Sequence, residues 1–170
     1  MSDLARPAPA LSPMTRFGPD DAPRILAHLL TLGTDDRMLR FGHGIRDEGL
    51  ASYVARLDYV RDHVHGLNDA RGDIVALAHI AMHDGDVDFG LSVTRPYRGQ
   101  GLGHALFSHV IAMAQRGGAA RVLCYSISPA VLHMAGLHGF RRSGGNPAAP
   151  LALQLPSPAP ASLSRSRAAA

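Results

Sequence analysis

The chain has 170 residues, the length of one domain, and its 46% hydrophobic and 18% charged residues are ordinary for a globular protein. All 17 basic residues are Arg, and they are dispersed rather than gathered in the basic stripe of a nucleic-acid-binding face, so we expect no nucleic-acid partner. The N-terminus lacks the apolar stretch of a signal peptide, and no run approaches the ~18 apolar residues of a membrane span. We therefore expect a cytoplasmic protein with no membrane partner. The single cysteine, Cys124, excludes an internal disulfide and a Cys-based zinc site.

The two ends of the chain differ in composition from its middle. Residues 1–13 and 156–170 are rich in Ala, Pro and Ser, and such segments bury too little apolar surface to offset chain entropy, so we expect two disordered tails. Residues 14–155 are expected to form one domain. Its first elements are predicted to be a strand and three helices, at residues 14–17, 20–33, 35–41 and 47–57.

Strands and helices alternate in the second half of the domain. Turn residues separate three apolar or alternating segments, which predict strands at residues 59–67, 74–82 and 87–93. The remaining elements are a helix, a strand, a helix and a strand, at residues 101–116, 121–127, 129–138 and 151–155. Ser128 and Pro129 suit the start of the last helix, and Gly139 suits its end. This order predicts an α/β fold, a mixed sheet with helices on both faces.

A glycine-rich run at residues 98–103 lies between a predicted strand and a predicted helix. The first N–H groups of a helix lack intrahelical partners, and glycines let the backbone curl around an anion, so this segment predicts a pyrophosphate site to which Arg98 adds charge. A Walker A loop is excluded because the chain has no Lys, and a Rossmann fingerprint needs a glycine where His104 stands. A glycine-rich turn that binds nothing is the alternative.

Two segments resemble the signatures of the GNAT superfamily of acyl-CoA N-acyltransferases. Motif A of that family resembles Val93-Thr94-Arg95-Pro96-Tyr97-Arg98-Gly99-Gln100-Gly101-Leu102-Gly103, with Pro one place later than is usual, and its Gly-Phe signature resembles Leu137-His138-Gly139-Phe140. The resemblance covers about residues 14–155 and implies the GNAT fold, a central, mostly antiparallel, twisted sheet with helices on both faces. It implies an acetyl-CoA-dependent N-acetyltransferase that acts by direct attack in a ternary complex. The acceptor would be a primary amine of a small molecule, peptide or protein, and a homodimer stays open.

The same resemblance implies a set of residues that bind acetyl-CoA as co-substrate. The backbone of Leu91, Ser92 and Val93 would pair with the pantetheine arm, and an N–H near Leu91 or Ser92 would stabilise the oxyanion. Ser128 stands where the family has an Asn that faces the pantetheine. The pyrophosphate would be held by N–H groups of Arg98, Gly99, Gln100, Gly101, Leu102, Gly103 and His104.

Amine acylation also needs a group that removes a proton, because a lysine-type amine has a pKa near ~10.4. Many relatives have a Glu on the strand before motif A, where this chain has Asp88. Asp88 shares a strand face with Gly90 and Ser92, so we predict that it is the general base, acting through a water because Asp is short. A solvated aspartate beside a turn is the alternative.

The Tyr that serves many relatives as general acid is replaced here by Ala135. Ser128 is our candidate for this second catalytic role, and Tyr125, His138 or solvent are the other substitutes. A catalytically lapsed acyl-CoA-binding regulatory module therefore remains an alternative to the enzyme.

Histidines and arginines outside the motifs leave further alternatives. His63 and His65 share one strand face, and His79 and His83 another, but nothing else supports a metal site, so we expect no metal. Three arginines lie in the helix-loop region that closes over the acceptor in the family. Their two interpretations are a solvated helix face and bidentate binding of a substrate carboxylate, and the residues are Arg37, Arg40 and Arg46.

Overall fold

One twisted sheet runs through the part of the chain that the computed structural model describes, which is residues 10–142, 144–146 and 148–156. The strand order is β1-β2-β3-β4-β5-β7-β6, and only β4 and β5 are parallel neighbours. The strands are β1 (Thr15–Phe17), β2 (His63–Asn68), β3 (Ile74–His83), β4 (Asp86–Val93), β5 (Arg121–Cys124), β6 (Arg141–Arg142) and β7 (Leu151–Gln154). This mixed, mostly antiparallel sheet confirms the predicted fold class.

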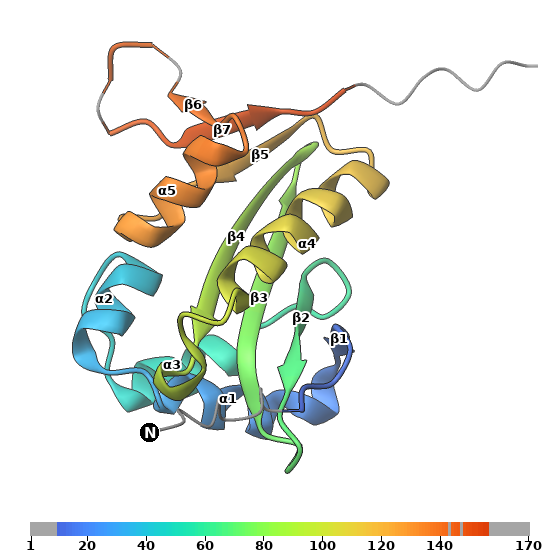
Figure 1. Cartoon of the computed structure of the whole chain (residues 1–170), viewed down its shortest axis with the longest axis vertical. Coiled ribbons are helices and arrows are strands. Elements are labelled where there is room, and N and C mark those ends of the chain that lie inside the picture. Colours follow the sequence, from blue (N-terminus) through green and yellow to red (C-terminus); the bar gives the residue numbers. More distant parts are fainter. Residues whose placement is uncertain (1–9, 143, 147, 157–170) are drawn as a thin grey trace, which may run out of the picture.

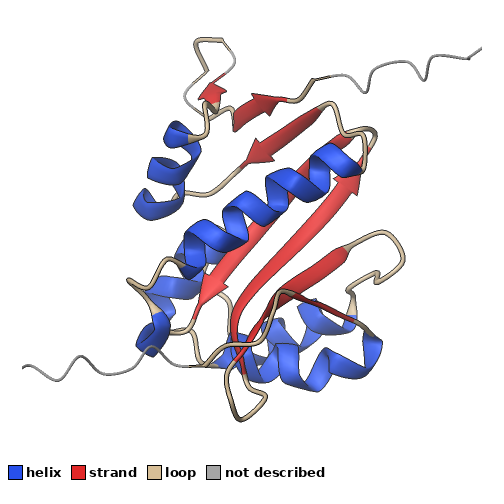
Figure 2. Cartoon of the chain, turned by 45° about the vertical axis from the view of Figure 1, so that its right-hand side comes forward, coloured by secondary structure: helices blue, strands red, loops and turns tan. Residues whose placement is uncertain are grey.

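Helices cover both faces of the sheet (Figures 1 and 2). The long helix α4 (Leu102–Arg116) crosses β3 and β4 on one face, with α5 (Pro129–Leu137) beside it. The opposite face carries α1 (Ala22–Leu30) and α3 (Asp47–Ala55), and α2 (Thr34–Phe41) packs against β4. Two short 3-10 turns, η1 (Pro19–Asp21) and η2 (Arg95–Tyr97), precede α1 and the glycine-rich run.

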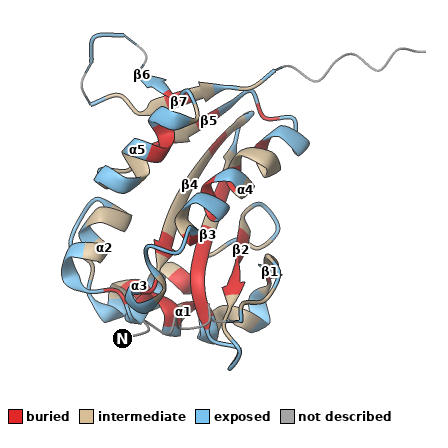
Figure 3. Ribbon diagram, in the orientation of Figure 1, coloured by how far each residue is buried: buried red, intermediate tan, exposed pale blue. Residues whose placement is uncertain are grey.

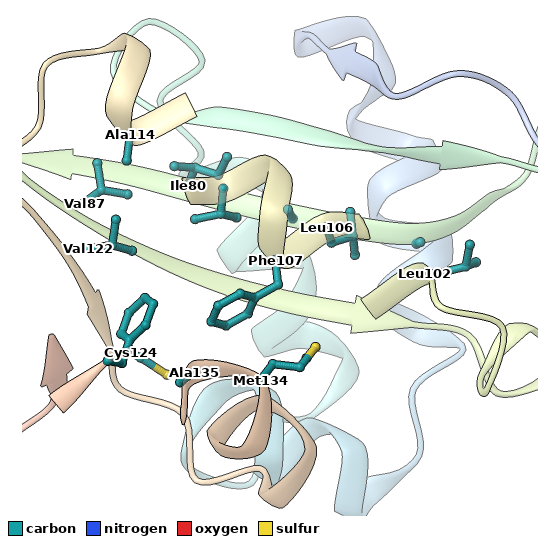
Figure 4. Close-up of a cluster of buried hydrophobic side chains, with 14 of the residues drawn as sticks. Ile80, Val87, Leu102, Leu106, Phe107, Ala114, Val122, Cys124, Met134 and Ala135 are labelled. Atoms are coloured by element: carbon teal, nitrogen blue, oxygen red, sulfur yellow. The ribbon is translucent and has the colours of Figure 1, made fainter. Parts of the chain in front are cut away.

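Alternation along β3 and β4 divides the buried side chains between two clusters. Ile80 and Val87 face α4 and join Leu106 and Phe107 of that helix in one cluster, drawn in Figure 4. Leu77 faces the other way and packs with residues of α1 and α3 in the second cluster. Figure 3 shows the buried residues concentrated along the central strands and on the inner sides of the helices. Each fully buried Leu or Phe contributes roughly 1.5–3 kcal/mol relative to an exposed one.

Two predicted strands are shorter in the structure than in the sequence analysis. The strand predicted at residues 59–67 begins only at His63, because Asp58 accepts hydrogen bonds from the N–H groups of Val60 and Arg61 and holds residues 58–62 in a turn. The strand predicted at residues 121–127 ends at Cys124, because the chain there turns away from β4. The remaining predicted elements are confirmed within a few residues at each end, while η2 and β6 were not predicted.

The predicted tails lie mostly outside the described residues, which begin at 10 and end at 156. Residues 10–13 form no helix or strand, but Ser12 bonds to Asn68 through its N–H and its hydroxyl, and Leu11 packs on the α4 cluster. This part of the predicted N-terminal tail therefore lies against the sheet.

Candidate active site

The separation of β4 from β5 opens a cavity on the sheet. The two strands pair only from Asp86 to Asp88 and from Arg121 to Leu123, and beyond these residues they part. A cavity of about 740 Å³ opens there, lined by α2, the second half of β4, the glycine-rich loop, residues 125–131 and α5. Its volume is within the ~300–1,000 Å³ typical of small-molecule sites.

The edge of β4 beyond Asp88 presents backbone groups to this opening. Thr94 donates its N–H to the Val75 carbonyl of β3 at 2.9 Å. Because strand N–H groups alternate in direction, Ser92 also faces β3, opposite Leu77, whereas Leu91 and Val93 face the opening. The predicted roles in pantetheine binding and oxyanion stabilisation need backbone groups that face the opening. Those of Leu91 and Val93 face it, and those of Ser92 face β3.

The Ser92 side chain is held by a buried histidine of α1. His28 Nδ1 lies 2.8 Å from the Ile74 carbonyl and must donate to it, so Nε2 accepts from the Ser92 hydroxyl at 2.7 Å. Burial lowers the His28 pKa to about 4, and the ring is neutral near pH 7. The pair joins α1 to β4 behind the cavity wall.

The glycine-rich loop has the geometry of an anion site. Gly99 and Gly101 adopt φ values of 74° and 82°, in the left-handed region that side chains disfavour. The first backbone hydrogen bond of α4 runs from Ala105 to Gly101, so the N–H groups just before Ala105 have no intrahelical partner. These N–H groups stand at the positive end of a 15-residue helix, beside the cavity, and fit a phosphate.

The Arg98 side chain does not extend freely into the cavity as a phosphate ligand. Its Nη1 and Nη2 bind the two carboxylate oxygens of Asp36 at 3.0 and 2.9 Å, and its Nε donates to the Val93 carbonyl at 2.9 Å. The guanidinium also lowers the Asp36 pKa below its usual value. Gln100 is likewise turned to the protein, because its amide donates to the Pro96 carbonyl. The backbone N–H groups, rather than the side chains of Arg98 and Gln100, are therefore the part of this loop that suits an anion.

Asp88 lies at the point where β4 and β5 part, opposite Ala81 in β3 and Leu123 in β5. Its face of β4 is the one it shares with Gly90 and Ser92, as expected. Its carboxylate is 3.6 Å from His83 Nε2, and the side chain is 37% exposed. Asp88 does not line the cavity itself, so the base role that we predict for it stays a prediction and requires a bridging water.

The candidates for the general acid are separated by the structure. Ala135 is fully buried and carries no titratable group. Ser128 and Tyr125 line the cavity, and the Ser128 hydroxyl makes no capping bond to α5. His138 instead stacks on Phe107, at 5.2 Å between ring centroids, and lies outside the cavity wall.

A chain of polar side chains beside β4 was not predicted as a unit. Arg40 donates through Nη2 to the Tyr53 hydroxyl at 3.2 Å, and that hydroxyl lies 2.6 Å from His79 Nδ1. His79 Nε2 is buried and lies 3.0 Å from an Asp62 oxygen, without a hydrogen bond of good geometry. Sequence reasoning singled out Arg40 and His79 but not Tyr53. The hydroxyl of a Tyr on a packed helix face needs a hydrogen-bond partner, and this requirement could have indicated that Tyr53 has a polar contact.

Three histidines form a second group on the α4 face of the sheet. His109 Nε2 lies 2.8 Å from His65 Nδ1, and the His63 ring is 6.1 Å from the His65 ring. Burial lowers the His65 pKa to about 4.

Across residues 10–142, 144–146 and 148–156, no group of three or more His, Cys, Asp or Glu side chains is arranged to hold a metal ion. None of the helices in these ranges has the length and apolar character needed to cross a membrane.

Comparison with known proteins agrees with this geometry. The sequence profile described as Acetyltransferase (GNAT) family matches residues 34–140. No curated protein matches the sequence of the chain.

Solved structures share the fold at low sequence identity. The GNAT domain of S. lividans PAT is 18% identical, with a TM-score of 0.68 over 84% of this chain and 89% of that one. The ribosomal-protein-S18-alanine N-acetyltransferase from Escherichia coli is 17% identical, with a TM-score of 0.63 over 91% and 99%. The PaiA N-acetyltransferase from Thermoplasma acidophilum, solved in complex with coenzyme A, is 9% identical, with a TM-score of 0.61 over 86% and 99%.

Proposed function

Because the chain belongs to the GNAT acetyltransferase family, we propose that it transfers an acetyl group from acetyl-CoA to a primary amine by direct attack in a ternary complex. The observation that carries the proposal is the opening between β4 and β5. There the free edge of β4 and the N-terminus of α4 face one cavity, at a spacing set by the η2 turn and the glycine-rich loop.

Backbone groups on two sides of the cavity suit the donor. Acetyl-CoA supplies an activated thioester: the amine nitrogen bonds to its carbonyl carbon, the carbon–sulfur bond breaks, and the proton lost by the amine balances the thiol that leaves. The Val93 N–H offers a strand hydrogen bond to a pantetheine amide oxygen, because the Val93 carbonyl already accepts from Arg98 Nε. The Leu91 N–H donates to the thioester carbonyl oxygen as charge develops on it. The N–H groups of Leu102, Gly103 and His104 hold the pyrophosphate.

The proposed reaction needs two proton transfers, one from the amine and one to the leaving thiolate. Asp88 takes the proton from the amine through a water, because its carboxylate lies at the apex of the opening but outside the wall. Ser128 or Tyr125, both in the wall, delivers a proton to the leaving thiolate, and solvent is the alternative donor.

A thiol-release assay tests the function directly. The protein is incubated with acetyl-CoA and a panel of amino acids, polyamines, peptides and lysine-bearing proteins, and free CoA thiol is measured against reactions that lack the amine. Calorimetric titration with CoA is run in parallel. Tight CoA binding without thiol release on any acceptor would contradict the enzyme and favour an acyl-CoA-binding regulatory module, for which Ala135 at the acid position is the supporting observation.

A further inference from the structure

One of the three arginines that sequence analysis grouped together lies in the cavity wall without an acidic partner. Arg37 is occupied, because it donates to the Leu32 and Ile45 carbonyls and to the Asp47 carboxylate. Arg46 is exposed and lies outside the cavity wall. Arg40 lines the cavity, and no carboxylate of the described residues lies within 4.0 Å of it.

The guanidinium of Arg40 lies directly on the backbone of β4. A Cβ atom placed on Gly90 would lie 1.9 Å from Arg40 Cζ, so the glycine leaves the space that the guanidinium fills. Gly90 is two residues from Asp88 on the same strand face and adjacent to Leu91, whose N–H faces the opening. The charge of Arg40 therefore lies beside the point where the amine must meet the thioester.

The position of Arg40 is fixed by its neighbours. The guanidinium lies over the Phe41 ring, 4.8 Å from its centroid, and donates through Nη2 to the Tyr53 hydroxyl. Asp62 beside His79 Nε2 favours the tautomer with the proton on that nitrogen, which leaves Nδ1 to accept from Tyr53. Tyr53 can then accept from Arg40 while it donates to His79.

This arrangement leaves hydrogen-bonding capacity on the cation. Arg40 Nε is buried without a partner, and among the described residues Nη1 makes no hydrogen bond and is not fully buried, while the residue lines the cavity. A partly desolvated guanidinium without a carboxylate partner is costly unless an anion from outside completes its contacts. The same positive charge disfavours a polyamine or a protonated amine at that place.

Resting on the proposed function, we infer that Arg40 binds a carboxylate of the acceptor, so that the acceptor is an amino acid or another amine whose carboxylate lies close to the reacting nitrogen. Asp62, His79 and Tyr53 act as positioning residues for Arg40. Arg37 and Arg46, the other two arginines of the region, take no part.

The test compares acceptors that share an amine and differ in the carboxylate. Alanine, leucine and phenylalanine are each compared with their carboxamides, by calorimetric titration into CoA-saturated protein and by KM in the thiol-release assay. We expect the wild type to favour at least one acid about tenfold or more over its carboxamide, the range of a charge-assisted hydrogen bond. Arg40→Gln should remove that preference by weakening binding of the acid relative to its carboxamide, and Arg46→Gln, which removes an exposed charge outside the cavity wall, should preserve it.

The outcomes separate this inference from the proposed function. Acid-selective binding without thiol release would contradict the function and support the inference. Equal use of acids and carboxamides by the wild type, or an equal loss of both in Arg40→Gln, would overturn the inference and leave the function standing. If Arg40→Gln fails to fold, Gly90→Ala provides a second variant, because its methyl group displaces the guanidinium without removing it.

Discussion

Asp36 and Arg98 form a two-point contact, at 3.0 and 2.9 Å, that joins α2 to the start of the glycine-rich loop. Asp36 side-chain exposure is 19%, so the carboxylate is only partly screened by water. The contact places a negative charge beside the site that we propose for a pyrophosphate, and it occupies the cation that would otherwise face the phosphates.

Replacing Asp36 by Asn is expected to tighten CoA binding. The substitution removes the negative charge and releases the Arg98 guanidinium toward the phosphates, where a charge-assisted contact forms. We expect Kd for CoA to fall about threefold to tenfold in calorimetric titrations at low salt, with a smaller gain at high salt. Asp35→Asn, on the same helix but exposed, is the control. Weaker binding in Asp36→Asn would show that the contact is needed to hold the loop in shape.

The glycine-rich loop offers a matched pair of substitutions. Gly101 has φ of 82°, so Gly101→Ala forces a left-handed alanine at a cost of about 1 kcal/mol and moves the N–H groups that precede α4. Gly103 is helical, and an added Cβ would make only an ordinary contact of 3.7 Å with Met134 Cε. CoA affinity should therefore fall about tenfold in Gly101→Ala and change little in Gly103→Ala. Equal effects of the two variants on Kd would contradict a backbone cradle.

The base assignment is tested at Asp88. Asp88→Asn keeps the size of the side chain and removes its basicity, so kcat/KM should fall by about 10²–10⁴, the usual contribution of a general base. CoA affinity and the melting temperature should stay near their wild-type values, because among the described residues the one ionic partner of the carboxylate is the exposed His83. Asp86→Asn, on the same strand face but paired with Arg121, should retain activity. Full activity of Asp88→Asn between pH 6 and 9 would remove the assignment.

The sequence predicted the fold and the backbone geometry of the glycine-rich loop better than the surroundings of Arg40, for a physical reason. The N–H groups of the α4 start and of β4 depend on local chain geometry, which Gly99, Gly101 and strand alternation encode within a few residues. The environment of Arg40 depends on Tyr53, from α3, and His79, from β3. No local pattern brings these residues together, because only the packing of α2 and α3 on the sheet does so.

The sequence also did not indicate the hydrogen-bond partners of two side chains in the predicted site. Arg98 was predicted to face a phosphate, but its partner Asp36 stands 62 positions away in the chain. Ser92 was predicted as a cofactor residue, and its hydroxyl is held by His28 from α1. In both cases the residue type was compatible with ligand binding, and a distant element determined what the side chain contacts.

Stability should depend on pH through the buried histidines. The pKa values of His28 and His65 fall from the ordinary 6.5 to about 4 because burial disfavours the charged ring. Between pH 4 and 6.5 the unfolded chain binds protons at these positions that the folded protein does not. The free energy of unfolding therefore rises with pH across this window, by up to about 1.4 kcal/mol per pH unit for each histidine, and levels off above about pH 7.

Urea denaturation at half-unit steps from pH 4.5 to 8 measures this dependence. His65→Gln should reduce the slope between pH 5 and 6.5, and His43→Gln, at an exposed position, is the control. If the pH slope of the free energy of unfolding is the same in His65→Gln as in the wild type, protonation of His65, which lies against His109, does not oppose folding.

Two glycines of the central strands test how the sheet accommodates Arg40. An added Cβ at Gly90 meets the far end of a flexible side chain, the Arg40 guanidinium, which can move away. An added Cβ at Gly66 would lie 2.2 Å from the Ala76 carbonyl oxygen. This oxygen is a backbone atom of the neighbouring strand and cannot move away. Gly66→Ala should thus lower the free energy of unfolding by about 2–3 kcal/mol, the upper range for overpacking, and Gly90→Ala by less than about 1 kcal/mol.

For acceptor binding we expect the opposite order: Gly90→Ala should have the larger effect and Gly66→Ala the smaller one. Gly90→Ala should raise KM for carboxylate-bearing acceptors about tenfold and leave Kd for CoA unchanged, because the displaced guanidinium no longer reaches the acceptor. Gly66→Ala, measured below its melting temperature, should keep the wild-type preference for acids over carboxamides, because Gly66 pairs with Leu77 on β3, away from the cavity. If Gly90→Ala instead unfolds the protein and Gly66→Ala does not, Arg40 is held more rigidly than its contacts with the Phe41 ring and the Tyr53 hydroxyl imply, and the guanidinium is part of the core rather than of the acceptor site.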